Sequence, residues 1–269
     1  GAERAAAPCV VPDSPPLERL LSRPNRLIAV ALLVLCAVAW LQLYGWGPAA
    51  QPAHVHGAHS WNPHQAALIL CMWLLMAVAM MLPTAAPAIL AFTDIARAGR
   101  EGVPAASRVT GFVSGYLAAW WAFGALATLT QWILANAAQR IPELATGHPL
   151  VGGVALMGAG LYQFSTIKDH CLTQCRSPMT FFLAHWRDGV SGALALGWRH
   201  GMHCVGCCWA LMALMLAAGS MNLAWTAALA VVMLAEKVLP AGRSVARIVG
   251  VALICSAVVL AGTWIARFR

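Results

Sequence analysis

Long apolar segments constrain the fold of this chain more than any other feature. A helix that crosses a bilayer needs about 20 mostly apolar residues. Of the 269 residues, 61% are hydrophobic and 10% are charged, whereas a soluble domain carries about a quarter charged residues. We therefore expect an all-α, polytopic transmembrane helix bundle and exclude a water-soluble enzyme. Seven segments qualify or nearly qualify as spans: Leu27–Trp46, Ala66–Phe92, Val109–Ala135, Leu150–Ile167, Gly189–Gly219, Leu223–Leu239 and Val245–Ala266.

The distribution of basic residues predicts the sidedness of the bundle. Most of the 17 Lys and Arg residues lie before the first segment or in alternate connections, at 93–108, 168–188 and 240–244 with its flanks. Cytoplasmic connections of membrane proteins are enriched in Lys and Arg. We expect a cytoplasmic N-terminal tail over residues 1–26 and a single transmembrane domain over 27–269. The net charge of +8 then reflects sidedness, and we expect the lipid bilayer, not nucleic acid, as the partner.

Glycine and proline predict how the helices pack. Gly111 with Gly115, and Gly197 with Gly201, have the GxxxG spacing that lets two helix backbones approach closely. Pro83 and Pro87 lie within the second segment. Because each removes a backbone donor and crowds the preceding turn, the second helix is expected to kink there.

Two groups of cysteine and histidine residues supply the ligands expected of a metal site. The first group follows the fourth segment and the second lies in the fifth; their members are His170, Cys171 and Cys175, and His200, His203, Cys204, Cys207 and Cys208. On a helix the second group covers about 140° of one face. The two groups can meet if the fourth segment, or the loop after it, folds back against the fifth segment near its glycines.

Three explanations of these cysteines remain open at this point. Thiolate and imidazole are ligands for soft or borderline ions, so Cu(I) or Zn fits the set. Disulfides would need an oxidising compartment, and the first group lies on the predicted cytoplasmic side. Cysteine is also a small apolar residue of membrane cores, which is our interpretation of the isolated Cys9, Cys36, Cys71 and Cys255.

Other polar and sulfur-bearing residues extend the hypothesis. Arg199 lies within a span, where ionisable groups usually have a partner or a function, and Glu236 could be its counter-charge, a metal ligand, or half of an interfacial pair with Lys237. The thioethers at Met72, Met76 and Met80 slightly favour copper over zinc, although such stripes usually serve packing. A separate histidine-rich connection could collect Zn(II) or Cu(II), or simply be solvated; its residues are His54, His56, His59 and His64, with His148 in the next outer connection.

Several short motifs resemble one bacterial family. They are Met80-Met81-Leu82-Pro83-Thr84, Tyr162-Gln163, Lys168 with Cys171 and Cys175, Cys204-Val205-Gly206-Cys207-Cys208-Trp209, and Glu236-Lys237. The family is the uncharacterised group of predicted metal-binding integral membrane proteins, and the resemblance covers roughly residues 66–239. It implies a metal-related role in the bacterial inner membrane. This chain departs from the family pattern at Thr166-Ile167, where a Pro-Leu pair is expected.

We therefore predict a metal-binding membrane protein that handles or delivers Cu(I), or alternatively Zn, rather than an enzyme. Its leading ligands are Cys171, Cys175, Cys204 and Cys207, with Cys208, His170, His200 and His203 in reserve. Partners would be other membrane subunits or a metalloenzyme client. Two alternatives remain: an accessory subunit of a larger membrane complex, and a membrane thiol–disulfide redox protein.

Overall fold

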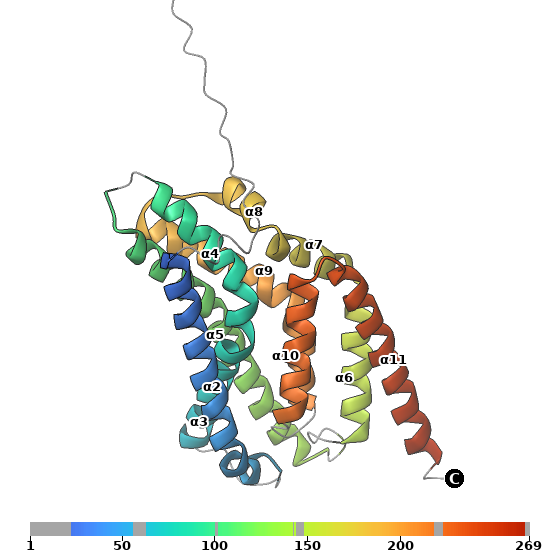
Figure 1. Cartoon of the computed structure of the whole chain (residues 1–269). Coiled ribbons are helices and arrows are strands. Elements are labelled where there is room, and N and C mark those ends of the chain that lie inside the picture. Colours follow the sequence, from blue (N-terminus) through green and yellow to red (C-terminus); the bar gives the residue numbers. More distant parts are fainter. Residues whose placement is uncertain are drawn as a thin grey trace, which may run out of the picture.

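The computed structural model describes residues 23–55, 63–99, 102–141, 143, 148–217 and 223–266, and these ranges are almost entirely helical (Figure 1). The helices are α2 (Arg23–Val55), α3 (Pro63–Met76), the π-helix η1 (Ala77–Met81), α4 (Leu82–Ala98), α5 (Ala105–Ala138), α6 (Pro149–Tyr162), α7 (Thr166–Arg176), α8 (Pro178–His185), α9 (Gly189–Ala217), α10 (Leu223–Val238) and α11 (Gly242–Ala266). The all-α expectation is confirmed for these residues.

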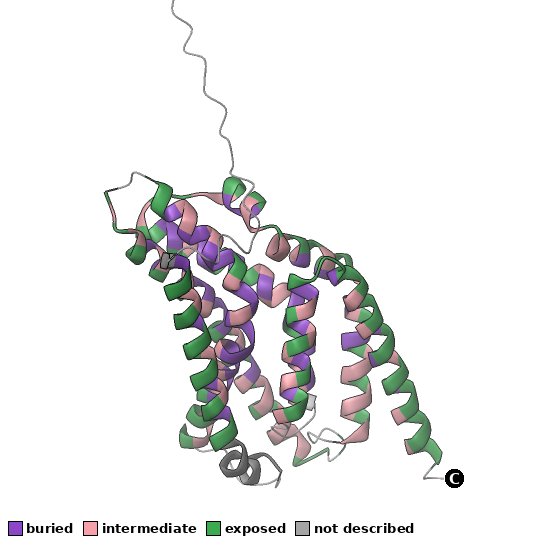
Figure 2. Cartoon of the chain, in the orientation of Figure 1, coloured by how far each residue is buried: buried purple, intermediate pink, exposed green. Residues whose placement is uncertain are grey.

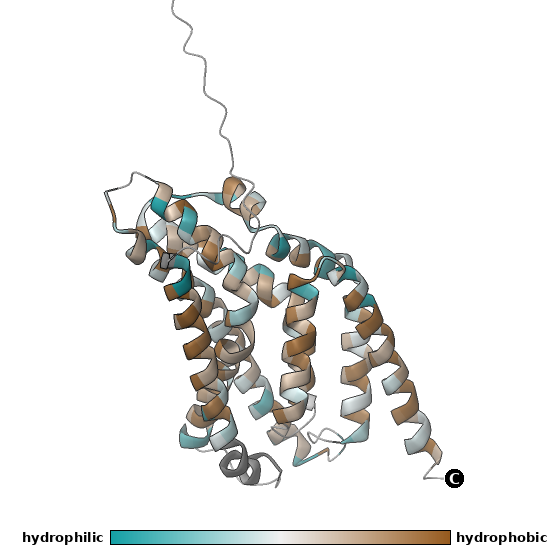
Figure 3. Cartoon of the chain, in the orientation of Figure 1, coloured by the Kyte–Doolittle hydropathy of each residue, from teal (hydrophilic) through white to brown (hydrophobic). Residues whose placement is uncertain are grey.

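Apolar side chains cover the outside of the bundle. Leu41 on α2 is 70% exposed and Ile248 on α11 is 68% exposed, and Figures 2 and 3 show that the exposed stretches of both helices are also hydrophobic. Such surfaces are unfavourable in water and match a lipid environment. Four helices of the described chain are long and apolar enough to cross a membrane, or five if the bent pair α6–α7 forms one span. The full count of seven spans remains a prediction.

The second predicted segment is a single helical run, 63–98, interrupted by the π-helical turn η1. Pro83 follows this turn and lacks the N–H that would bond the carbonyl of Ala79. The Ala79 carbonyl instead accepts from Cys36 Sγ and from Trp40 Nε1, each at 3.2 Å. Helix α2 therefore supplies the donors that the proline removes, and the local departure from α-helix lies where the sequence predicts a kink.

Helices α5 and α9 pack backbone to backbone, as the GxxxG spacing predicts. A Cβ atom added at Gly197 would collide with the carbonyl of Phe112, and one added at Gly115 would collide with the carbonyl of Leu194. At Gly201 the added atom would lie 2.7 Å from the Cβ of Ala119. This contact fixes the middle of α9 against the core of the bundle.

The fourth predicted span and the loop after it differ from expectation. Helix α6 ends at Tyr162, and α7 begins at Thr166 after a bend of 64°. The expected cytoplasmic loop 168–188 is instead formed largely by helices α7 and α8. Ser165 starts the new helix, since its hydroxyl accepts from the backbone N–H of Lys168 at 3.1 Å, a typical N-cap.

Helices α7 and α8 lie across one end of the bundle, and the ends of other helices near residues 23, 98, 105, 238 and 242 lie at the same end (Figure 1). Side-chain contacts join these ends: Asn25 Nδ2 donates to Asp94 Oδ1 at 2.9 Å, and Arg97 Nη1 donates to Asn25 Oδ1 at 3.5 Å. The described basic connections therefore gather on one side, as the charge pattern predicts. That this side faces the cytoplasm remains a prediction.

Candidate metal site

The bend before α7 folds this short helix back onto α9, which is the arrangement that the two cysteine groups require. Gly206 makes the contact possible, because an added Cβ there would lie 2.6 Å from Cys171 Sγ. Tyr162, at the end of α6, donates its hydroxyl to the carbonyl of the same glycine at 2.5 Å. Arg176, at the end of α7, bonds the carbonyls of Glu236 at 2.8 Å and Pro240 at 2.9 Å. Hydrogen bonds from the end of α6, just before the bend, and from the end of α7 therefore hold α7 in place.

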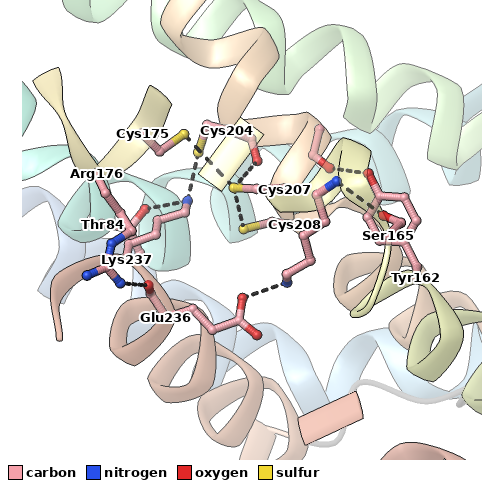
Figure 4. Close-up of polar contacts among 12 residues, drawn as sticks. Thr84, Tyr162, Ser165, Cys175, Arg176, Cys204, Cys207, Cys208, Glu236 and Lys237 are labelled. Carbon is pink, nitrogen blue, oxygen red and sulfur yellow. Dashed lines mark hydrogen bonds and ion pairs between the residues drawn. The ribbon is translucent and has the colours of Figure 1, made fainter. Parts of the chain in front are cut away.

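The fold brings cysteines of both groups together (Figure 4). Cys175 Sγ of α7 lies 4.0 Å from Cys207 Sγ of α9, and Cys207 Sγ lies 3.4 Å from Cys208 Sγ. Cys207 also contacts the carbonyl of Cys204 through its sulfur at 3.2 Å. The three cysteines of α9 are buried and Cys175 is half-buried. All of these cysteines are free, so the cluster consists of unpaired sulfurs inside the bundle.

The sulfur positions define a pair rather than a closed cage. No group of three or more His, Cys, Asp and Glu side chains in the described ranges is arranged to hold a metal ion. A soft ion with metal–sulfur bonds of about 2.3 Å separates two sulfurs by up to about 4.6 Å when it lies between them. The Cys175–Cys207 separation of 4.0 Å falls within this limit. The geometry fits one ion held between two thiolates.

A buried lysine lies against the third cysteine of the cluster. Lys237, near the end of α10, places Nζ 2.8 Å from Cys204 Sγ and 3.1 Å from Thr84 Oγ1. Tyr116 of α5 contacts the same sulfur through its hydroxyl at 3.0 Å. A neighbouring ammonium group stabilises a thiolate. Cys204 therefore has an environment that Cys175 and Cys207 lack.

The second lysine of the site forms an ion pair. Lys168 Nζ of α7 lies 2.7 Å from Glu236 Oε2 of α10, and both side chains are almost completely buried. Figure 4 shows the Glu236 carboxylate on the same side of the site as the cysteines, with this ion pair as a dashed line. Of the alternatives left open for Glu236, the counter-charge of Arg199 is wrong, because Glu236 pairs with Lys168 and Arg199 is exposed. Glu236 and Lys237 are not an interfacial pair either, because both are buried and have different partners.

The histidines divide between two environments. His200 is buried among aromatic rings, with ring centroids 5.4 Å from Phe181 and 5.9 Å from Tyr116. Its Nδ1 is buried and has no hydrogen-bond partner within the described ranges. His170 and His203 lie together nearer the surface, with ring centroids 6.1 Å apart. His200 therefore lies on the cysteine side of α9, one turn before Cys204, and the other two form a separate pair.

The outer histidines do not form a second cluster in the described residues. His148 caps α6, since its Nδ1 accepts from the backbone N–H of Leu150 at 3.2 Å. His64 is exposed at the start of α3. His54, His56 and His59 lie outside the residues whose side chains the structure describes. The proposed collecting role of this connection stays a prediction.

Sequence reasoning missed the polar residues that surround the cysteines. Lys237 and Tyr116 contact Cys204, and Thr84 contacts Lys237; the three come from different helices. The paired motif Glu236-Lys237 was an available signal for the lysine, because ionisable residues in apolar segments usually have a specific partner. Tyr116 had no signal beyond its position next to Gly115, which faces α9.

Comparison with known proteins adds a family to this geometry. No curated protein and no solved structure is significantly similar to the chain. A family model described as "PpoB2: Copper chaperone" matches residues 70–260. The matched range includes both cysteine groups, both lysines and the helices that position them, and it agrees with the metal-related family that the motifs resemble. The chain belongs to the PpoB2 copper chaperone family.

Proposed function

We propose that this protein is a membrane-embedded copper carrier that binds Cu(I) between Cys175 and Cys207 and passes it to a metalloenzyme client. The observation that carries the proposal is the 4.0 Å separation of these two sulfurs, which come from different helices. Soft thiolate ligands select Cu(I). The family match provides independent support for copper as the cargo.

The number of available ligands favours copper over zinc. Structural zinc sites are almost always four-coordinate and tetrahedral, and the described residues contain no group of three or more candidate ligands around one point. Cu(I) accepts as few as two or three sulfur ligands, and the 4.0 Å separation lets two thiolates bind one ion with a bent geometry that leaves room for a third sulfur. A buried pair of thiolates is therefore a better site for Cu(I), which needs fewer ligands, than for Zn(II).

Neighbouring thiols provide a route for transfer. Cys208 lies 3.4 Å from Cys207, and Cys171 lies on the same face of α7 as Cys175, one turn earlier. An ion held by two sulfurs can move by gaining a third and losing one of the first two. In this scheme Cys171, Cys204 and Cys208 are exchange ligands, and His170, His200 and His203 are additional ligands. We place the carrier in the bacterial inner membrane, with the α7–α8 end in the cytoplasm.

The test is elemental analysis of protein purified anaerobically in mild detergent under reducing conditions and loaded with Cu(I). Near-stoichiometric copper is expected in the wild type and a loss of most of it in Cys175→Ser with Cys207→Ser. The matched control is Cys71→Ser with Cys255→Ser, which changes two exposed cysteines and should retain the copper.

Other outcomes would support the alternatives. A Cys175–Cys207 disulfide that forms and breaks reversibly without metal would favour a thiol–disulfide redox protein. Stoichiometric co-purification with other membrane subunits, together with no bound metal, would favour an accessory subunit. Either result, with no copper in the wild type, would contradict the carrier proposal.

A further inference from the structure

The surroundings of Lys237 differ from those of an ordinary buried lysine. Nζ lies 2.8 Å from Cys204 Sγ, 3.1 Å from Thr84 Oγ1 and 3.9 Å from Met81 Sδ. In the described part of the chain, no carboxylate lies within ion-pair distance of this ammonium, since Glu236 is paired with Lys168. Burying an ammonium without a carboxylate partner is costly. The counter-charge of this ammonium is therefore the Cys204 thiolate, the same group that a soft cation would bind.

The atoms around Nζ include those that a soft cation prefers. Two of them are soft ligands, the cysteine sulfur and the methionine sulfur, and thiolate and thioether ligands select Cu(I). The third, the Thr84 hydroxyl, is a partner of the ammonium and not a ligand for a soft ion. The ammonium carries the same single positive charge as Cu(I). Lys237 therefore occupies a position in which a singly charged soft ion has ligands.

Hydrogen bonds fix the two sulfur atoms that surround this position. Met81 is the last residue of the π-helix η1, and π-helical turns occur frequently at functional sites. Its carbonyl accepts from Tyr116 at 2.9 Å and from Thr84 Oγ1 at 2.8 Å, which ties this turn to α5. The same tyrosine hydroxyl contacts Cys204. The two sulfur ligands are thus presented from η1 and α9 by one hydrogen-bonded network.

We propose that Cys204 and Met81 form a second Cu(I) position in which the ammonium of Lys237 stands in for the ion. The inference rests on the proposed carrier function and extends it, because this position is next to the Cys175–Cys207 pair. Copper enters when the flexible lysine stem moves the ammonium aside, and the ammonium returns when copper leaves. The ion and the ammonium compete for Cys204, so Lys237 lowers the affinity of this position and aids release.

The test measures the affinity of purified protein for Ag(I), a redox-inert singly charged probe, and for Cu(I), each against a chromogenic chelator. Lys237→Gln removes the competing charge and is expected to bind both ions at least about tenfold more tightly. X-ray absorption of the loaded variant should show one more sulfur neighbour than the wild type. Lys237→Arg retains the charge and should keep the wild-type affinity and sulfur count.

Met81 provides the decisive second variant. Adding Met81→Leu to Lys237→Gln should remove both the gain in affinity and the extra sulfur. Met80→Leu on the same background is the matched control, because Met80 is buried in the same π-helical turn, and it should change neither. Thr84→Val keeps the ammonium but removes one of its partners, so it should raise the affinity by about threefold even if Lys237→Gln does not fold.

The outcomes separate the two proposals. If the wild type binds neither ion through Cys175 and Cys207, the carrier function fails. The second position is wrong, and the carrier function stands, if the wild type binds the ions but Lys237→Gln binds them no more tightly. The same conclusion follows if the gain in affinity of Lys237→Gln survives the addition of Met81→Leu. An unchanged affinity in Thr84→Val would also contradict the competition.

Discussion

Helix α9 packs against α5 through glycine and against α7 through sulfur. On the α5 side, Gly197 lies directly on the backbone of Phe112, and Gly115 of α5 lies on the backbone of Leu194. On the α7 side, one glycine, Gly206, admits the half-buried side chain of Cys171. The first contact joins two backbones, whereas the second joins a backbone to side chains.

The difference shows how one helix serves as scaffold and as site. Close backbone contacts leave no room for adjustment, because protein interiors are densely packed. Side-chain contacts can shift by rotation about single bonds. The α5 side therefore holds α9 in place, and the α7 side can alter sulfur positions as an ion enters or leaves.

The largest loss of stability is expected when the Lys168–Glu236 ion pair, which joins α7 to α10, is broken. Glu236→Ala leaves Lys168 buried without its partner at 2.7 Å. Removing one partner of a buried pair typically costs about 3–5 kcal/mol of stability. Thermal unfolding in detergent should show this loss. The double change Lys168→Met with Glu236→Leu removes both charges and should recover most of it; a double variant as unstable as Glu236→Ala would contradict the ion-pair explanation.

The next largest loss of stability is expected where α9 contacts α5. Gly197→Leu forces a side chain into the backbone of α5 at Phe112, and overpacking of this kind costs about 1–3 kcal/mol or more. The same change at Gly158, which has no neighbouring atom within 4 Å, is the control and should cost little. Copper bound per folded molecule should stay unchanged in both variants. Loss of copper without loss of stability in Gly197→Leu would place this face in the site.

The glycine and cysteine patterns predicted much of this arrangement. GxxxG spacing predicted close backbone contacts at these glycines, although not which helices make them, and α5 and α9 make them with each other. Helical periodicity placed Cys204, Cys207 and Cys208 near one face, and all three are buried. The need for the two cysteine groups to meet predicted that the chain folds back, which it does at the bend before α7. Each of these features depends on a local pattern in the sequence.

The partners of the charged residues could not be predicted in the same way. Lys168 appeared to belong to a basic cytoplasmic connection, yet it lies on a helix and is buried against Glu236. Glu236 and Lys237 are adjacent in sequence, but successive side chains on a helix diverge by about 100°. One therefore meets α7 and the other meets α9 and α4. These partners depend on how three helices are placed, which no local pattern specifies.

A smaller effect on stability is expected at the glycine of the α7 side. Gly206→Ala places a methyl group where Cys171 Sγ would be 2.6 Å away. Because Cys171 Sγ belongs to a side chain, the protein can adjust at a cost of about 1 kcal/mol. The shift of α7 should separate Cys175 from Cys207 and slow their oxidative cross-linking several-fold. Adding Cys171→Ala makes room for the methyl group and should restore the rate; an undiminished rate in Gly206→Ala would show that this glycine does not set the sulfur separation.

The smallest effect is expected from Tyr162, whose hydroxyl donates to the Gly206 carbonyl at 2.5 Å. Tyr162→Phe removes one hydrogen bond, which costs about 1 kcal/mol or less, and the Cys175–Cys207 cross-linking rate should stay within about twofold of wild type. Tyr44→Phe is the control, since Tyr44 is 71% exposed. The rate should hold because Ser165, Arg176 and the Lys168–Glu236 pair also position α7. A rate as low as that of Gly206→Ala would instead make this one bond the main determinant of where α7 meets α9.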